Sequence, residues 1–398
     1  MDAKAVEHKP SARVLDVTRL STRAGRILTG VDRVELAYLD AVSAQADVPC
    51  FAICKTALGY VLLDRQGMLA FATQIKSNNW QASDVLGRLN PRLNAATRIG
   101  QTAVRRLAIG RASRWGLGRL LGRLPDGFAY LNVGHSHLTT RIFEAVRAVR
   151  NTRIVVMIHD TIPLDFPQFQ RPETTSLFRQ KLQRVACFAD VILCPSVAAR
   201  SDILRHVKTM GRVPKVLPAL LGVTAPSLGD VEIPDTPYFV TVGTIEPRKN
   251  HALLLDVWDN LPQPRPQLLI CGQRGWLNDA VFDRLDNGSD GVQEVSSASD
   301  AHVAALVAGA SGFLFPSFCE GFGLPPAEAA LLQTPVICSD LPVCREVLKE
   351  HAIYLDPHDR YQWEKEIMQC ASANRTTTQQ DYDPPRWETH FKIVFTVT

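Results

Sequence analysis

The sequence predicts an α/β protein made of two doubly wound domains, each with a largely parallel sheet. Short apolar runs alternate with helical patterns along most of the chain, the order expected of βαβ units. At 398 residues the chain is long enough for two domains of about 150 to 200 residues, each with its own core. A stretch rich in Pro and Gly, residues 211–237, predicts the linker between them. We therefore expect a first domain over residues 1–225, a second over 226–375, and a tail over 376–398.

The composition is that of an ordinary globular protein, with 46% hydrophobic and 21% charged residues. The nine cysteines form no C-x-x-C pair, so neither a zinc cage nor a disulfide framework is indicated, and reduced thiols in a cytoplasm fit best. The N-terminal residues lack the apolar core of a secretion signal, and no run of about 18 apolar residues occurs. We expect a cytoplasmic protein that neither is secreted nor spans a membrane.

The first βα unit is expected to lie beside a ligand. A strand over Arg13–Val17 is followed by a helix from about Val31, with Gly30 at the turn between them. A glycine in the first βα loop of a doubly wound sheet lets the backbone approach a phosphate, and Arg33 would then point inward. The alternative is a plain strand-to-helix turn.

Basic charge is concentrated in residues 88–123, which contain nine arginines and no Asp, Glu or Lys. The chain has a formal net charge of +4, so the remainder, with 35 basic and 40 acidic residues, is slightly acidic. Two interpretations stay open: a flexible, solvated insertion, or contact with an anionic membrane surface. No recognisable nucleic-acid module accompanies the arginines, so no nucleic-acid partner is expected. The apolar residues that could insert into a membrane are Leu107, Trp115, Leu117, Leu120 and Leu121.

Two polar segments follow strands later in the first domain. The strand over residues 153–159 ends in His159 and Asp160, and His135 lies in the loop after an earlier strand, FAYLNV. The carboxyl edge of a parallel sheet is where α/β proteins keep reacting groups. A histidine that only stabilises its loop by hydrogen bonding is the alternative interpretation.

In the second domain, the strand YFVTVG leads into the loop 244–250, where Arg248 and Lys249 lie beside a helix start. Two cations at a helix N-terminus oppose the helix dipole, which makes sense if a diphosphate lies between them and the amides. We expect this loop to be exposed. A solvated basic loop without a ligand is the alternative.

The most informative stretch is Ser311–Leu348. A buried strand over Gly312–Phe315 breaks into a Gly-rich loop, and two prolines then open a helix. Glu320 lies in the loop and Glu328 about one turn into the helix, so both carboxylates can face one crevice and bind hydroxyls. The amides of the loop and the helix dipole favour a phosphate nearby. The alternative is a capped βα loop with two solvated glutamates. The loop residues concerned are Gly321, Phe322 and Gly323.

The run F-P-S-x-x-E-G-F-G-L-P-x-x-E-A resembles the E-x7-E signature of retaining GT-B glycosyltransferases, particularly the mannosyltransferase-like members of glycosyltransferase family 4. The resemblance is strongest from about Phe239 to Leu355. It implies two Rossmann-like domains that face each other across a cleft, with the acceptor bound by the first and the nucleotide sugar by the second. It also implies that the C-terminal tail packs back toward the first domain.

Specific residues acquire roles through this resemblance. Glu320, His159, Arg248 and Lys249 would be catalytic, and Glu328 would bind the nucleotide ribose. The family places an Arg directly after the strand glycine, Gly243, where this chain has Thr244, so Arg248 would supply that charge. The implied donor site is Gly30, Gly243, Arg248, Lys249, Gly321, Phe322, Gly323, Leu324 and Glu328. The implied acceptor side is Arg33, His135 and Asp160.

The expected activity is transfer of a hexose, mannose from GDP-mannose in particular, to a lipid-linked glycan acceptor in bacterial polysaccharide synthesis, with retention of configuration. We expect no cofactor and no metal, because the sequence offers no D-x-D-like acidic pair in a suitable loop and cations can stabilise the leaving diphosphate. Peripheral contact with the inner face of the plasma membrane would run through residues 88–123. The alternatives are a UDP-sugar donor, a sugar-nucleotide epimerase or phosphorylase on the same fold, and a non-catalytic membrane scaffold.

Overall fold

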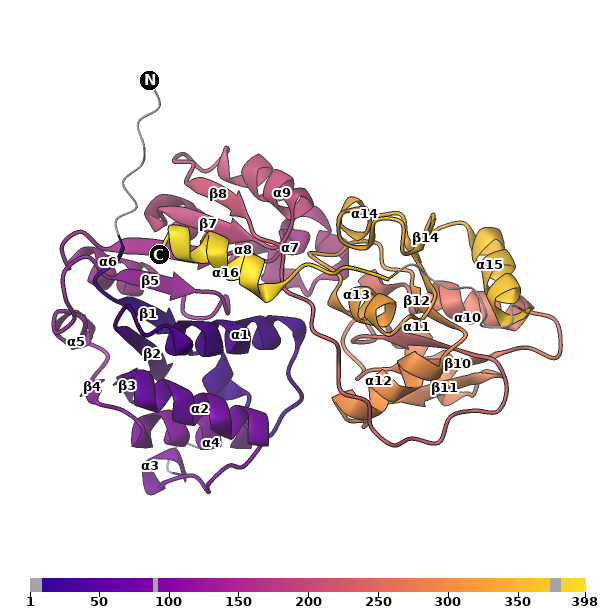
Figure 1. The fold of residues 1–398 in the computed structure, drawn as a ribbon, viewed down its shortest axis with the longest axis horizontal. Coiled ribbons are helices and arrows are strands. Elements are labelled where there is room, and N and C mark those ends of the chain that lie inside the picture. The colour runs from indigo at the N-terminus through magenta and orange to yellow at the C-terminus, as the bar shows by residue number, and fades with distance from the viewer. Residues whose placement is uncertain (1–8, 89–91, 373–380) are drawn as a thin grey trace.

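The computed structural model describes residues 9–88, 92–372 and 381–398, which form two lobes, each built around a sheet (Figure 1). The N-terminal sheet has the strand order β4-β3-β2-β1-β5-β6-β7-β8 and is parallel except where β3 pairs with β2 and β4. Its strands are β1 (Arg13–Asp16), β2 (Cys50–Thr56), β3 (Gly59–Leu63), β4 (Gly110–Ala112), β5 (Ala129–Asn132), β6 (Arg153–Met157), β7 (Val191–Cys194) and β8 (Lys215–Pro218).

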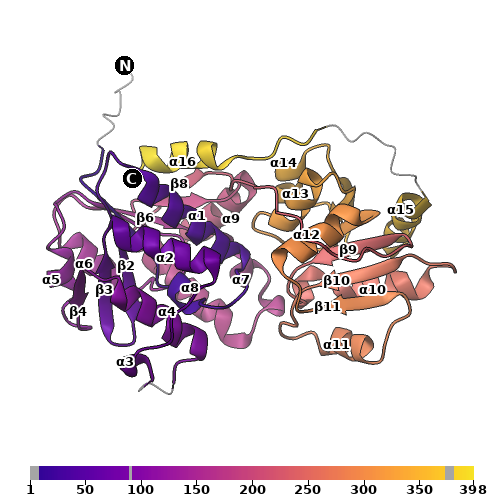
Figure 2. The ribbon, with the colours of Figure 1, turned by 60° about the horizontal axis from the view of Figure 1, so that its bottom comes forward.

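Helices pack around this sheet and connect its parallel strands (Figure 2). They are η1 (Leu20–Thr22), α1 (Gly30–Ala44), α2 (Arg65–Ser77), α3 (Val85–Arg88), α4 (Ala95–Arg106), α5 (Leu117–Leu121), α6 (Thr140–Arg147), α7 (Ile162–Asp165), η2 (Pro167–Phe169), α8 (Pro172–Phe188) and α9 (Val197–Val207). The inner strands of both sheets are apolar and mostly buried, as expected when helices cover both faces.

The second sheet is parallel throughout, with the order β11-β10-β9-β12-β13-β14. Its strands are β9 (Tyr238–Val242), β10 (Gln267–Cys271), β11 (Val292–Val295), β12 (Gly312–Phe315), β13 (Val336–Ser339) and β14 (Ile353–Leu355). The helices of this part are η3 (Pro247–Lys249), α10 (His251–Asn260), α11 (Asp279–Asp286), α12 (Asp300–Gly309), α13 (Leu324–Leu331), α14 (Pro342–Leu348) and α15 (Arg360–Ser372). The predicted fold class, two α/β units with parallel sheets, is confirmed.

The last helix, α16 (Trp387–Thr396), lies on the N-terminal lobe although it follows the C-terminal sheet in sequence (Figures 1 and 2). The His390 ring is hydrogen-bonded to the Tyr38 hydroxyl of α1 at 2.8 Å. The Arg13 guanidinium donates to the Oγ1 and the backbone oxygen of Thr398, both at 3.2 Å. The C-terminal segment is therefore part of the N-terminal lobe.

The expectation that residues 211–237 are wholly linker is wrong. Lys215–Pro218 forms β8, which pairs with β7 along the edge of the N-terminal sheet. The short K-V-L-P run lies between prolines and glycines, which hide its extended pattern, and an edge strand tolerates Pro218 because one side needs no partner. The chain leaves the first sheet after Pro218 and enters the second at Tyr238.

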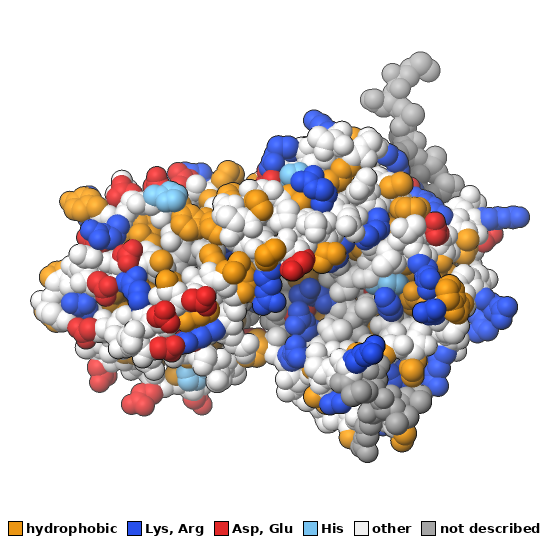
Figure 3. Space-filling view, turned by 180° about the vertical axis from the view of Figure 1, so that it is seen from behind, with side chains coloured by type: hydrophobic (Ala, Val, Ile, Leu, Met, Phe, Trp, Pro, Cys, Tyr) orange, Lys and Arg blue, Asp and Glu red, His pale blue; other side chains and the backbone are white. Residues whose placement is uncertain are grey.

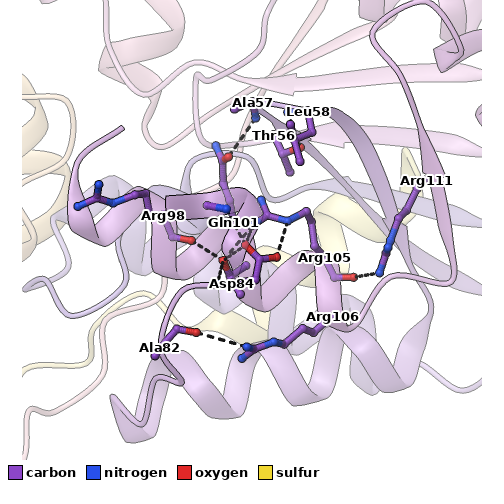
Figure 4. A network of polar contacts seen from close by, with 12 residues as sticks. Thr56, Ala57, Leu58, Ala82, Asp84, Arg98, Gln101, Arg105, Arg106 and Arg111 are labelled. Atoms are coloured by element: carbon purple, nitrogen blue, oxygen red, sulfur yellow. Dashed lines mark hydrogen bonds and ion pairs between the residues drawn. The ribbon is translucent and has the colours of Figure 1, made fainter. Parts of the chain in front are cut away.

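The basic segment is folded in its described residues, so of the two open interpretations the flexible insertion is wrong there; residues 89–91 lie outside the described residues. Figure 4 shows Arg105 of α4 directed at Asp84, and this buried arginine is held there by an ion pair of 2.5 Å. Arg106 donates to the side-chain oxygen of Gln81 at 2.6 Å, and Arg111 to the Arg105 carbonyl at 2.7 Å. Several of the arginines thus stabilise the fold itself.

The apolar residues of the same segment mostly face inward. Leu117, Leu120 and Leu121 are at most 2% exposed and belong to the core under the N-terminal sheet, so the expectation that they insert into a membrane is wrong. Leu107 is half-buried against the other core cluster. Trp115, in contrast, is 73% exposed. Figure 3 shows Lys and Arg side chains around hydrophobic ones on this lobe, at the right of that view.

Candidate active site

The candidate site lies where the loops at the carboxyl ends of the two sheets meet. The loop after β12 contacts the loop after β6: a Cβ at Gly321 would lie 2.7 Å from the His159 carbonyl oxygen and 3.1 Å from the Asp160 Cβ. The two lobes therefore approach so closely at this point that only glycine fits at position 321. Most residues that the sequence assigned to the donor and the acceptor lie around this contact.

Glu320 forms the centre of a charge cluster with the two cations of the loop after β9. Its Oε1 lies 2.6 Å from the Lys249 ammonium and 2.8 Å from the Arg248 guanidinium. Burial by itself would raise the pKa of Glu320, but the charges of Arg248 and Lys249 outweigh it and lower that pKa to about 2. Glu320 is thus a carboxylate that is held ionised in a mostly buried place.

The expectation that Lys249 lies in an exposed loop is wrong, because its side chain is only 10% exposed. The ammonium lies 4.5 Å from the centre of the Phe315 ring. The side chain folds over Gly243, whose φ of +150° is open to glycine, and a Cβ there would lie 3.4 Å from the Lys249 Cε. Burial lowers the pKa of Lys249; the Glu320 carboxylate opposes this effect and the Arg248 charge adds to it.

Arg248 is held by two carboxylates. The first is Glu320, and the second is Glu246, whose Oε1 lies 2.5 Å from the Arg248 Nε. Glu246 is buried and was not selected from the sequence. The Arg248 Nη1 also donates to the Cys319 carbonyl at 3.2 Å. Although burial opposes it, Glu320 and Glu246 raise the pKa of Arg248. Arg248 therefore links the loop after β9 to the loop after β12, the position that the sequence assigned to a diphosphate-binding charge.

The start of α13 provides the remaining donor-site residues of the sequence prediction. Gly323 precedes the helix with a φ of +91°, and Phe322 is buried in the core. Leu324, the first helical residue, faces Gly30 across the cleft, where a Cβ would make an ordinary contact of 3.6 Å. Gly30 is thus placed opposite the donor loop.

Glu328 forms an ion pair with Arg33 of α1, so the two residues connect the lobes. The sequence assigned Glu328 to a nucleotide ribose and Arg33 to the acceptor side. The structure brings both to the same place, and here each neutralises the other.

Two histidines of the N-terminal lobe, His135 and His159, have lowered pKa values. Burial lowers the pKa of His159 to about 4, and its Nε2 donates to the Val133 carbonyl at 2.7 Å. Burial also lowers the pKa of His135 well below its ordinary value, and its Nε2 accepts from the backbone N–H of His159 at 3.2 Å. Burial raises the pKa of Asp160, which the Arg248 charge opposes. His135 and His159 each bind a backbone group of the neighbouring loop, so their rings form part of this side of the cleft.

Two residues at the cleft were not selected from the sequence as site residues. The Ser196 hydroxyl caps α9 by accepting from the Ala199 N–H at 3.0 Å, and it also donates to the Gly321 carbonyl at 3.3 Å. The Glu346 carboxylate of α14 accepts from the N–H groups of Val197, at 2.7 and 3.0 Å, and Ala198, at 3.1 Å. No sequence signal marks Glu346, because its partner is a helix N-terminus 149 residues away.

The C-terminal part of the chain matches a known protein family. Residues 230–382 match the family of glycosyl transferases group 1. This range contains Arg248, Lys249, Glu320 and Glu328, so the matched segment includes the cluster described above.

The relatives are named as mannosyltransferases. The chain is 31% identical over 222 residues to the serotype-specific mannosyltransferase WbdA of Escherichia coli, covering 50% of this chain and 27% of the relative. It is 29% identical over 224 residues to the O-antigen chain mannosyltransferase B of Escherichia coli, covering 53% and 59%. The chain thus spans less than two thirds of the length of these relatives.

Among solved structures, the sucrose-phosphate synthase of Thermosynechococcus elongatus superimposes with a TM-score of 0.61 at 15% identity, covering 98% of this chain and all of that one. At this identity the likeness concerns the fold alone, and it shows that both lobes together adopt the two-domain GT-B arrangement. Within residues 9–88, 92–372 and 381–398, no cluster of three or more His, Cys, Asp or Glu side chains could hold a metal ion. None of the helices in these ranges has the length and apolarity to cross a bilayer.

Proposed function

We propose that the protein transfers a mannosyl group from a nucleotide-sugar donor, GDP-mannose, to a glycan acceptor in polysaccharide synthesis, with retention of configuration. The observation that carries the proposal is the buried cluster in which Arg248 and Lys249 converge on Glu320, within the segment that matches glycosyl transferases group 1. The relatives of Escherichia coli, a serotype-specific mannosyltransferase and an O-antigen chain mannosyltransferase, support mannose as the transferred sugar and polysaccharide as the product.

The charges suit departure of a nucleoside diphosphate. Negative charge develops on the leaving phosphate, and fixed cations in a site that excludes water stabilise it more than solvent would. Arg248 and Lys249 occupy that role in the proposal, while Glu320 binds hydroxyls of the transferred sugar. The cations also provide the stabilisation that a divalent ion would otherwise supply, which is why we propose a metal-independent reaction.

Glu328 is proposed to bind the nucleotide ribose. Its ion pair with Arg33 is half-exposed on the arginine side, where the side chain is 40% accessible, so the pair is open to exchange. Nucleotide binding would replace this contact by hydroxyl hydrogen bonds and release Arg33 toward the acceptor, as its proposed role requires.

A thermal-shift screen with GDP, UDP, ADP and dTDP tests the donor first. We expect GDP to raise the melting temperature most, and Glu328→Gln to weaken that shift. Hydrolysis of GDP-mannose without acceptor then separates an enzyme from a scaffold, and NMR of the product anomer reports retention. Stabilisation by UDP alone would replace GDP-mannose by a UDP-sugar, and no response to any nucleotide would refute the proposed function.

We further propose that the protein works in the cytoplasm at the inner face of a bacterial membrane, on a lipid-linked acceptor. The surface that supports this is smaller than the sequence predicted. The exposed Trp115 ring lies within 4.4 Å of the Arg114 guanidinium and 4.9 Å of that of Arg141. Exposed arginines around a single exposed aromatic ring suit anionic headgroups, with each charge worth about 1 kcal/mol near such a surface.

A further inference from the structure

Several positive charges surround loop 134–138 of the N-terminal lobe, away from the cluster at Glu320. On one side, Arg19 follows β1, and a Cβ at Gly134 would lie 3.0 Å from the Arg19 Cβ and 1.8 Å from the Oε2 of Glu35. Burial raises the pKa of Glu35 well above its ordinary value. On the other side, the Phe178 ring of α8 lies 6.2 Å from the His135 ring, and Arg184 donates to the Leu138 carbonyl at 3.2 Å. The loop is therefore flanked by β1–α1 residues and by α8.

Lys181 lies on the α8 face that contacts this loop. It is three residues after Phe178 and three before Arg184, and residues spaced by three or four share one face of a helix. Among the described residues, no carboxylate or other acceptor lies within hydrogen-bonding distance of its half-buried ammonium. A half-buried lysine without a partner bears a desolvation cost that an anion would offset.

The neighbouring charges do not compensate Lys181. Burial lowers the pKa of Lys181, and the charges of Arg19 and Arg184 lower it further. The carboxylate that Arg19 contacts, Asp32 at 2.6 Å, is shared with Arg23 at 3.1 Å. The other carboxylates at the loop are engaged too: Asp16 lies 3.0 Å from the His137 Nδ1, and Glu35 accepts from the Leu20 N–H at 3.2 Å. Lys181 is therefore the cation of this group that has no polar partner among the described residues.

We propose that Arg19, Lys181 and Arg184 bind a phosphate or diphosphate group of the acceptor. This inference rests on the proposed function, because loop 134–138 adjoins His159, the residue that faces the donor loop at Gly321. The group bound here belongs to the acceptor, since the donor diphosphate is assigned to Arg248 and Lys249 in the other lobe. Oxygen atoms of a phosphate suit both the fixed forks of arginine and the point charge of lysine.

The site is tested by measuring the binding of inorganic pyrophosphate to the full chain with isothermal titration calorimetry. The variants are Lys181→Gln, Lys181→Arg as the charge-conserving rescue, and Arg179→Gln as the matched control. Arg179 is an exposed cation of the same helix, two positions from Lys181 and therefore on another face. A Lys249→Met protein distinguishes pyrophosphate binding at the donor cluster from binding at Lys181.

We expect two anion sites. Lys181→Gln should weaken one of them by about 10- to 100-fold, the loss expected for one charged hydrogen bond, while Lys181→Arg restores most of the affinity. Arg179→Gln should bind like the wild type, and Lys249→Met should affect only the other site. Equal pyrophosphate binding in wild type and Lys181→Gln would overturn the proposal.

The source of the phosphate is read from competition with pyrophosphate at the Lys181-dependent site. Competition by a hexose 1-phosphate assigns a soluble phosphorylated acceptor, and competition by a short-chain prenyl diphosphate alone assigns a lipid-linked one. Competition by neither overturns the acceptor assignment. A failure of the proposed function can be distinguished from a failure of the anion site. If pyrophosphate binding depends on Lys181 but no nucleoside diphosphate stabilises the protein, the anion site stands and the transferase function is refuted.

Discussion

Lys249→Met is the variant that best separates the chemistry of the charge cluster from its effect on folding. The Lys249 ammonium contacts Glu320 at 2.6 Å, and its stem packs on the Phe315 ring. Methionine keeps most of the apolar stem and removes the charge. The Glu320 carboxylate keeps its contact with Arg248 at 2.8 Å. The variant is therefore expected to fold.

The size of the stability effect follows from the pKa of Glu320. A shift from the ordinary 4.5 to about 2 corresponds to about 3 kcal/mol of net stabilisation of the ionised form. Because two cations contribute at similar distances, we assign about half of this to Lys249. Removing a buried ammonium also removes its desolvation cost, so the free energy of unfolding at pH 7 should fall by only about 1 kcal/mol.

Turnover should fall much more. Loss of one fixed charge aimed at the leaving phosphate raises the barrier by about 2 to 4 kcal/mol, which is about 30- to 1000-fold in rate. The assay is mannosyl transfer from GDP-mannose, with urea unfolding of the same preparations. Lys208→Met, which removes an exposed lysine at the end of α9, is the matched control and should change neither quantity.

The pH dependence of stability gives an independent measurement. Since the folded-state pKa of Glu320 is depressed, its contribution is fully present above pH 4.5 and is lost as the pH falls toward 2. Without Lys249 this pKa rises, so the variant should lose stability at a higher pH than the wild type during acid titration. A Lys249→Met protein that transfers sugar at the wild-type rate and has an unchanged acid profile would refute the reasoning.

Three further outcomes are expected. Glu328→Gln should lower nucleotide affinity about tenfold with little change in melting temperature, and unchanged affinity in a nucleotide titration would remove the ribose assignment. Glu346→Ala should leave the N–H groups at the start of α9 without their carboxylate, at a cost of about 1 kcal/mol, and favour separation of the lobes, which small-angle scattering would report as a larger radius of gyration. An unchanged radius and stability would contradict the view that Glu346 holds the lobes together. Trp115→Ser should reduce co-sedimentation with anionic liposomes at low salt, and equal binding to neutral and anionic vesicles would exclude the electrostatic contact.

Local patterns explain which parts of the fold were predictable. The strand at Gly312–Phe315 and the helix opened by Pro325 and Pro326 follow from an apolar run and from proline's preference for a helix start. The eight-residue spacing from Glu320 to Glu328 is a property of one βα unit. Each of these features depends on neighbours within about ten residues, which is the range that periodicity reports.

The features that the sequence missed depend on residues far apart. The burial of Lys249 results from its contacts with Phe315 and Glu320, which lie on a different strand and its loop. Likewise, the inward direction of Leu117 and Leu120 depends on packing under a sheet whose edge strand, β4, comes from the same basic segment. A pattern of arginines and leucines does not distinguish this core from a membrane surface, because both bury the same apolar atoms.

The donor loop is completed only when the lobes are together. Arg248 and Lys249 hold Glu320 from within the C-terminal lobe, but Gly321 is bounded by the His159 carbonyl and by the Ser196 hydroxyl, both from the other lobe. Ser196 also caps α9, whose next N–H groups are bound by Glu346 of the C-terminal lobe. The N-terminal end of α9 therefore contacts both the donor loop and α14. Separation of the lobes would leave the α9 amides and the Gly321 carbonyl without these partners, so in the proposed reaction sugar transfer belongs to the closed arrangement, where the sugar is shielded from water.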